Sequence, residues 1–220
     1  MVSAFAAANS VVLGQVKTDI KSNEITAIPK LLDLLDVRGC IVTIDAMGCQ
    51  TKIAKKIVDK GGDYLLPVKG NQERLQTALD GIFSIGRLEL PETEAYTTKE
   101  KGHGREEIRM CMVTDADEIG DLVFEWSGLK TLGYVVSFRT EKDMQTTVAV
   151  KFYISSAKLD SKSLLEASRA HWAVENNLHW QLDISMHEDS CRIRQQNSTE
   201  NLELIKLGLF RVTIHALSPV

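Results

Sequence analysis

The chain has 220 residues, of which 44% are hydrophobic and 25% are charged, and its formal net charge is −4. This length allows one large domain or two small ones, and the acidic balance excludes a strongly basic clamp for nucleic acid over the whole surface. No apolar run approaches the roughly 18 residues needed to cross a bilayer, and four cysteines without a CxxC pair favour a reducing, cytoplasmic location.

The first part of the chain, residues 1–85, alternates between strand-like and helix-like patterns. Short apolar runs predict strands, and apolar residues at spacings of three and four predict helices. Pro29 should mark the first turns of its helix or kink it. The run 40–45 is almost entirely apolar and ends in an acid, which is typical of a strand buried on both faces. In chain order we predict strands at 2–8 and 11–17, a helix over 24–36, a strand at 40–45, a helix over 50–60, a strand at 64–68 and a helix that ends near residue 83.

The rest of the chain divides into a second and a third part. Residues 86–150 are rich in Thr, Val and Glu, and alternating segments at 105–114, 133–139 and 146–155 predict a β-rich insertion. Residues 151–220 return to the core, with a long helix over about 161–184 and a final helix over about 199–217. The order of strands and helices predicts an α/β fold.

Asp45 and Glu175 are the candidate metal ligands. Asp45 stands at the C-terminal end of a predicted strand, where ligands of α/β sheets usually bind and where Mg²⁺ accepts carboxylates. The alternative is that Asp45 only caps the turn or the following helix. Glu175 lies on an apolar helix face beside Trp172, so it is either a structural acid paired with Arg or His, or a ligand. Acids from a strand end and a later helix can converge on two metals that stabilise phosphoryl transfer.

Two histidines lie on the same helix face as Glu175, which leaves zinc as a further alternative. His171, Glu175 and His179 follow one another at spacings of four, which differs from the HExxH spacing of zinc proteases. Three ligands spread over about 12 Å of a straight helix cannot all reach one ion. We therefore favour pairing of the histidines with acids or with phosphate.

Two further segments are candidates for DNA contacts. Lys69, Gly70 and Asn71 follow a predicted strand and open a helix, an arrangement that suits a phosphate or a plain strand–helix turn. His103, Gly104 and Arg105 form either a basic tip on the DNA backbone or a solvated hairpin.

Five stretches of the chain, taken together, resemble the insertion-sequence transposases of the H-repeat-associated family. The resemblance covers nearly the whole chain, to about Leu204, and rests on long motifs in a fixed order. These motifs are LGQVKTDIKSNEITAIPKLLDLLD, IVTIDAMGCQTKIAKKI, YLLPVKGNQ, HGREEIR and RAHWAVENNLHWQLDISMHED.

The resemblance implies a DDE transposase with a ribonuclease-H-like mixed sheet flanked by helices and a β-rich insertion before the last catalytic helix. Such enzymes hold two divalent ions, normally Mg²⁺ and also Mn²⁺, with three carboxylates, and they cleave DNA at transposon ends and join it to target DNA. By motif, Asp45 is similar to the second aspartate and Glu175 to the glutamate. His171 occupies the place of an arginine in the signature of the wider group, and Lys69, Asn71, Arg105, His171 and His179 are the expected DNA contacts. Whether the chain forms a homo-oligomer is left open.

The sequence departs from the family pattern at its start. The family's first aspartate lies in an Asp-Gly-Lys motif upstream of the stretch that resembles VSAFAAAN, and no aspartate precedes Asp19 here. We therefore expect an N-terminally truncated transposase chain that is inactive alone, because one carboxylate of three is missing. The alternative is a non-catalytic remnant that binds DNA or dimerises.

Overall fold

The structure, a computed structural model, describes residues 2–6, 11–16, 24–83, 95–102, 104–141 and 145–171. These residues form a mixed α/β fold and divide into two compact units, one of 2–35 with 169–171 and one of 36–168. None of the helices within these ranges is both long enough and apolar enough to span a membrane.

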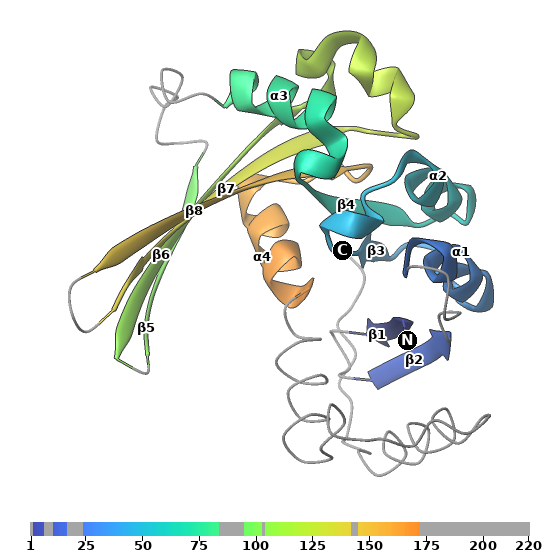
Figure 1. Cartoon of the computed structure of the whole chain (residues 1–220), viewed down its shortest axis with the longest axis horizontal. Coiled ribbons are helices and arrows are strands. Elements are labelled where there is room, and N and C mark those ends of the chain that lie inside the picture. The colour runs from blue at the N-terminus through green and yellow to red at the C-terminus, as the bar shows by residue number, and fades with distance from the viewer. Residues whose placement is uncertain are drawn as a thin grey trace. The chain divides into compact units, whose positions relative to one another are not determined.

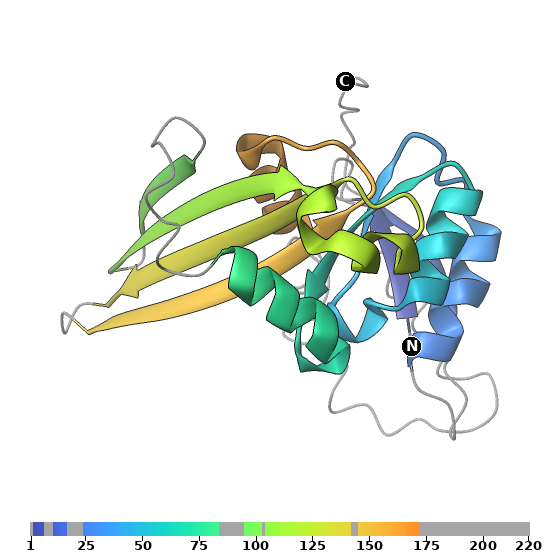
Figure 2. The ribbon, with the colours of Figure 1, turned by 90° about the horizontal axis from the view of Figure 1, so that it is seen from above.

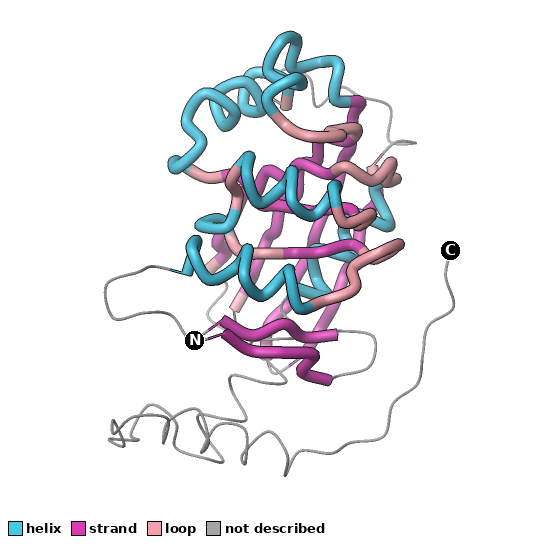
Figure 3. The backbone as a smooth tube through the Cα atoms, turned by 90° about the vertical axis from the view of Figure 1, so that its right-hand side faces the viewer, coloured by secondary structure: helices cyan, strands magenta, loops and turns pink. Residues whose placement is uncertain are grey.

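The first unit is an antiparallel pair of strands with one helix against it. Strands β1 (Val2–Ala6) and β2 (Val11–Val16) form a two-stranded sheet among the described residues, and Figure 3 shows them in magenta beside the N-terminus. Helix α1 (Glu24–Leu34) buries four residues at helical spacing against this unit, Ala27, Ile28, Leu31 and Leu32. Pro29 lies in the interior of α1 rather than in its first turn.

The second unit is built on a six-stranded sheet with the order β3-β4-β8-β7-β6-β5 (Figure 1). Only β3 and β4 are parallel, and every other neighbouring pair is antiparallel. The strands are β3 (Ile41–Thr43), β4 (Asp63–Val68), β5 (Tyr96–Gly102), β6 (Arg105–Asp115), β7 (Thr131–Thr140) and β8 (Thr146–Ser155).

Helices cover one half of the long strands on both faces. Phe83, which follows α3 (Glu73–Ile82), stacks on Tyr134 of β7 and Phe152 of β8 with ring centroids 5.4 Å and 6.3 Å apart. On the opposite face, α4 (Ser161–His171) buries Leu164 and Leu165 against the sheet. Figure 2 shows α3 and α4 on the two sides of the strands. Helix α2 (Thr51–Asp59) packs against β4, and 3₁₀ segments η1 (Ala46–Gly48), η2 (Gly70–Gln72) and η5 (Ala116–Glu125) complete the unit.

Buried hydroxyl groups join β4 to the end of β8. Ser155 Oγ donates to the carbonyl of Tyr64 at 2.6 Å, and Ser156 Oγ accepts from the Tyr64 N–H at 3.0 Å. Ser156 Oγ also donates to Asp63 Oδ1 at 2.7 Å. Because a buried hydroxyl without a partner is costly, these bonds fix where β8 meets β4.

The other half of the long strands extends past α3 and α4 as an arm (Figures 1 and 2). We use "the arm" for β5, for 105–110 of β6, for 137–140 of β7 and for 146–150 of β8. In β8 the five residues 146–150 are all exposed, whereas Phe152 to Ser155 are all buried. The same strands therefore pass from a covered environment into an open one.

The α/β class and the strand and helix order predicted for residues 1–85 are confirmed. One prediction is wrong: the strand at 40–45 is not buried on both faces. Strand β3 has three residues, Ile41 is 42% exposed, and β3 pairs on one side only among the described residues. An apolar run signals affinity for a sheet, but the layers that cover its two faces decide its burial. The domain boundaries at 85/86 and 150/151 stay predictions.

Candidate active site

The carboxyl ends of β3 and β4 lie at the same edge of the sheet, the edge that is formed by strand ends. The two strands are parallel, with Thr43 opposite Leu65, so the segments that follow them leave the sheet side by side. Asn71 Nδ2 donates to the carbonyl of Ala46 at 2.8 Å, and Gln72 Nε2 donates to the carbonyl of Cys49 at 2.8 Å. These two bonds tie the segment after β4 to the segment that begins with Asp45.

Asp45 is exposed at this edge, and its carboxylate has one oriented oxygen. Oδ1 accepts from the Gly48 N–H at 3.2 Å and caps the η1 turn, so the capping alternative is observed. Among the described residues Oδ2 has no hydrogen bond or ion pair. A carboxylate held by one backbone N–H keeps lone pairs on both oxygens for a hard cation, so capping and metal binding are compatible.

Two of the predicted DNA contacts lie on the same edge as Asp45. Lys69 and Asn71 are exposed, and they flank Gly70 in the η2 turn that leads into α3. The Asn71 amide donates to the loop of Asp45, as described, while Lys69 is exposed to solvent. The bond from Asn71 therefore joins the turn after β4 to the loop of Asp45, and the role of Lys69 and Asn71 as DNA contacts stays a prediction.

Arg105 lies elsewhere in the same unit, at the tip of the arm. It pairs with Gly102 at the turn between β5 and β6, ten residues from Asp115 at the other end of β6. At roughly 3.3 Å per residue the tip is about 30 Å from the covered end of that strand. The acid and lysine side chains near the tip pair with each other, as in the contacts of Glu106 with Lys99 and Lys101 at 2.5 Å and 3.3 Å. The structure therefore does not bring Arg105 to Asp45.

The helix that carries the second predicted acid is described only in part. Helix α4 ends the described ranges at His171, which is half-buried. Glu175 and His179 lie outside the described residues, and so does His103. In the ranges that the structure describes, no three His, Cys, Asp or Glu side chains gather into a set that could hold a metal ion.

A thiol near the Asp45 loop is not a candidate ligand. Cys49 ends η1 and is fully buried, and burial raises the pKa of its thiol to about 12. Burial does the same to Cys111 in β6, whose pKa rises to about 12. Both thiols are shielded from solvent, and a thiol that keeps its proton near neutral pH is a poor nucleophile.

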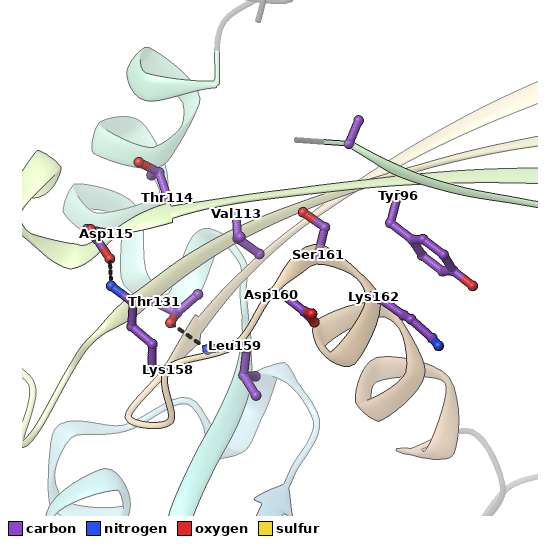
Figure 4. A pocket seen from close by; sticks show the side chains of 11 residues that line it. Tyr96, Val113, Thr114, Asp115, Thr131, Lys158, Leu159, Asp160, Ser161 and Lys162 are labelled. Carbon is purple, nitrogen blue, oxygen red and sulfur yellow. Dashed lines mark hydrogen bonds and ion pairs between the residues drawn. The ribbon is translucent and has the colours of Figure 1, made fainter. Parts of the chain in front are cut away.

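Sequence reasoning did not single out a cavity of about 610 Å³ between β5, β6 and the start of α4 (Figure 4). Its charged residues are engaged in local contacts: Lys158 Nζ lies 2.5 Å from Asp115 Oδ1, and Asp160 Oδ1 accepts from the Ser163 N–H at 2.7 Å. The contact with Ser163 holds the pKa of Asp160 below its usual range. The bond to Ser163 caps the start of α4, and its sequence signal is the helix-capping pattern Asp160-Ser161-Lys162-Ser163.

Residues 1–209 match the family model described as Transposase DDE domain. The chain belongs to this family. It is 52% identical over 204 residues to the "H repeat-associated putative transposase YhhI" of Escherichia coli K12. The matched region covers 91% of this chain and 54% of YhhI.

Other relatives give the same picture. The chain is 52% identical over 204 residues to "Putative protein YbfL" of the same strain, with 91% of the chain and 54% of YbfL covered. It is 49% identical over 209 residues to "Putative transposase YncI" of Escherichia coli O157:H7, with 94% of the chain and 54% of YncI covered. The chain therefore spans about half the length of the curated relatives that it matches, and the predicted resemblance to H-repeat-associated transposases is confirmed.

Proposed function

We propose that these residues form part of the catalytic core of a DNA transposase that cleaves and joins DNA strands with divalent metal ions. The observation that carries the proposal is the position of Asp45 at the carboxyl end of parallel strand β3, within a chain of the DDE family. Asp45 and Glu175 are the proposed metal ligands in this chain. Their oxygen donors suit Mg²⁺ and Mn²⁺, which prefer carboxylates.

The ribonuclease-H-like architecture and the insertion are part of the same proposal. A parallel pair, β3 and β4, lies beside long antiparallel strands, and the β-rich stretch from β5 to β8 stands between Asp45 and the helix that leads to Glu175. This order supports the interpretation of 86–150 as an insertion between the two acids.

The chemistry of the two ions would be to stabilise the attacking and leaving oxygens of a phosphoryl transfer. The residues of this chain orient the reactants. We assign Lys69, which follows β4, to the neutralisation of a backbone phosphate, and Asn71 holds the Asp45 loop through its bond to Ala46. We propose His171 and His179 as further phosphate contacts and Arg105 as a contact to DNA remote from the reacting phosphate.

We further propose that residues 1–220 by themselves have little or no strand-transfer activity. The resemblance calls for a third carboxylate in an Asp-Gly-Lys strand, and that motif does not occur in these 220 residues. Two carboxylates would bind the ions weakly and leave the developing charge poorly neutralised. A longer chain that also contains such a strand would complete the set.

The test measures Mn²⁺ binding by calorimetry, and nicking of duplex DNA that carries the terminal inverted repeat. We expect weak Mn²⁺ binding by the 220-residue chain that is lost in Asp45→Asn and in Glu175→Gln. Asp59→Asn is the matched control, because Asp59 is an exposed acid paired with Lys55 on α2. In a longer, active chain the two site substitutions should lower nicking by at least roughly 10²–10³-fold.

Three results would contradict parts of the proposal. Mn²⁺ binding that Asp45→Asn leaves unchanged would remove Asp45 from the site. Nicking by the 220-residue chain that Asp45→Ala abolishes would keep the catalytic role of Asp45 but overturn the predicted inactivity. Retained DNA binding without any Mn²⁺ binding would favour the non-catalytic alternative.

A further inference from the structure

The outer edge of β8 in the arm has no neighbouring strand among the described residues. Strand β4 pairs with β8 only from Phe152 to Ser155 and ends at Val68. Along residues 146–150 the other side of β8 pairs with β7. An edge of this kind turns the N–H and C=O groups of alternate residues outward, where they can pair with another strand.

The two edges of this sheet differ in how they are protected. Strand β5, at the far edge, contains Lys99, Glu100 and Lys101 in seven residues, and charges on an edge discourage pairing with other chains. The open part of β8 reads TTVAV and contains no charge, proline or glycine. These five residues have the composition that favours a strand partner.

An apolar face lies beside the unprotected edge. Register places Val148 beside Phe138 of β7 and Ile108 of β6, and Val150 beside Val136 and Met110 on the same face. Val148 is 59% exposed, Val150 49% and Phe138 37%. Nearer the helices, the stacked rings of Phe83, Tyr134 and Phe152 cover the same face of the sheet. This cover stops at Phe152, two residues along β8 from Val150.

We infer that the open edge of β8 pairs with the same edge of a second copy of this chain, antiparallel about a two-fold axis at Val148. In that register Val148 faces Val148, Thr146 faces Val150 and Thr147 faces Ala149, so small or β-branched side chains meet and no charges are opposed. If the two-fold axis is perpendicular to the sheet, the apolar faces of the two copies lie on the same side of the joined sheet. They then form one apolar face of twice the area. The same patch serves both copies, as an isologous interface requires.

The size of this interface fixes its expected strength. A ladder of five residue pairs with the adjoining apolar side chains is smaller than the roughly 1,200–2,000 Å² of a standard stable interface. We therefore expect a weak, concentration-dependent dimer, with a Kd in the micromolar range or above. The dimer would give a continuous sheet through both copies without altering the residues proposed for catalysis.

The first experiment follows the oligomeric state of the 220-residue chain by sedimentation equilibrium over a range of protein concentrations. We expect a monomer–dimer equilibrium whose Kd rises at least about tenfold in Val148→Lys, because two like charges then face each other. Thr97→Lys is the matched control, since Thr97 is exposed on the same face at the β5 edge and should leave the Kd unchanged. A chain that is monomeric at all concentrations, or a dimer that Val148→Lys does not weaken, overturns the inference.

The second experiment tests the register without relying on affinity. In a background of Cys40→Ser and Cys191→Ser, Val148→Cys should form a disulfide-linked dimer on mild oxidation, because directly opposed residues in a ladder lie within disulfide range. Thr146→Cys should not, since the two copies of residue 146 would be about 13 Å apart. Equal cross-linking at both positions, or none at Val148, contradicts the two-fold pairing and points to a different occupant of the edge.

Discussion

The covered half and the arm are parts of the same strands, yet their side chains lie in different surroundings. In β7 the residues Thr131 to Val136 are all buried, whereas in β8 the residues 146–150 are all exposed. Both stretches are rich in Val and Thr. The difference is the presence of α3 on one face and α4 on the other, so burial here is decided by which helices return to the strand and not by the strand's own composition.

The largest expected difference between the halves concerns aliphatic side chains. Leu164 of α4 is fully buried against the sheet, so Leu164→Ala should lower the free energy of unfolding by about 2–5 kcal/mol. Val148→Ala in the arm should change it by less than about 0.5 kcal/mol. Urea unfolding of both variants tests this, at a protein concentration low enough to keep the chain monomeric. A cost at Val148 close to that at Leu164 would mean that the arm is packed in solution.

The next largest effect is expected at a close contact between β7 and α4. A Cβ on Gly133 would lie 2.3 Å from Leu164 Cδ1, which is buried and has little room to move, so Gly133→Ala should cost about 1–3 kcal/mol. Gly102 of β5 has no atom within 4 Å of the same position, and Gly102→Ala should be nearly neutral. A double-mutant cycle sharpens the test, because Gly133→Ala should cost less once Leu164→Ala has removed the clashing carbons. Additive costs would exclude this contact as the cause.

Local sequence patterns predict the individual helices and strands but not the order of the strands in the sheet. Periodicity located α1, α2, α3 and the start of α4 because each has one apolar face, and alternation located β6, β7 and β8. The strand order is not encoded in any one segment: β8 lies between β4 and β7, which are far apart in sequence. That order depends on contacts such as Ser155 and Ser156 with Tyr64, which no local pattern reveals.

The candidate site divides in the same way. An apolar run that ends in an acid pointed to Asp45 as a candidate ligand, and in the structure the turn after β4 is joined to the Asp45 loop through Asn71. The bond from Asn71 to Ala46 could not be predicted, because it joins two loops. The meeting of Asp45 with Glu175 stays a prediction, since Glu175 lies outside the described residues.

A pH dependence should report on two buried thiols, Cys111 in the covered half and Cys49 after η1. Burial raises the pKa of Cys49 and of Cys111 from 9.0 to about 12, so the folded chain keeps these protons while the unfolded chain loses them above about pH 9. The unfolded state then binds fewer protons, and stability should fall as the pH rises from about 9 toward 12. Between pH 8 and pH 10 the loss should be roughly 1–3 kcal/mol in urea unfolding. A Cys49→Ala, Cys111→Ala double variant should flatten this slope, and a slope that stays unchanged would contradict the assignment.

The smallest effect is expected from the ion pairs on the polar face of the arm. Arg109 of β6 lies between Glu100 and Glu107, with nitrogen–oxygen distances of 3.1 Å and 2.6 Å, and its side chain is 17% exposed. Since water reaches both acids, Arg109→Met should cost only about 0.5–1 kcal/mol, and the cost should shrink in 1 M salt. Lys55→Met, which removes the exposed pair with Asp59 on α2, is the control and should cost about 0.5 kcal/mol or less.

The outcome at Arg109 decides how independent the arm is. A cost above about 2 kcal/mol that does not depend on salt would mean that the ion pairs are shielded from water and that the arm is held as firmly as the covered half. A small loss of stability that salt screens would mean that the backbone hydrogen bonds between β6, β7 and β8 maintain the arm. Its side chains would then be available for contacts with other molecules. The apolar face on the opposite side of the same strands then remains the one surface of the arm that gains substantially from burial by a partner.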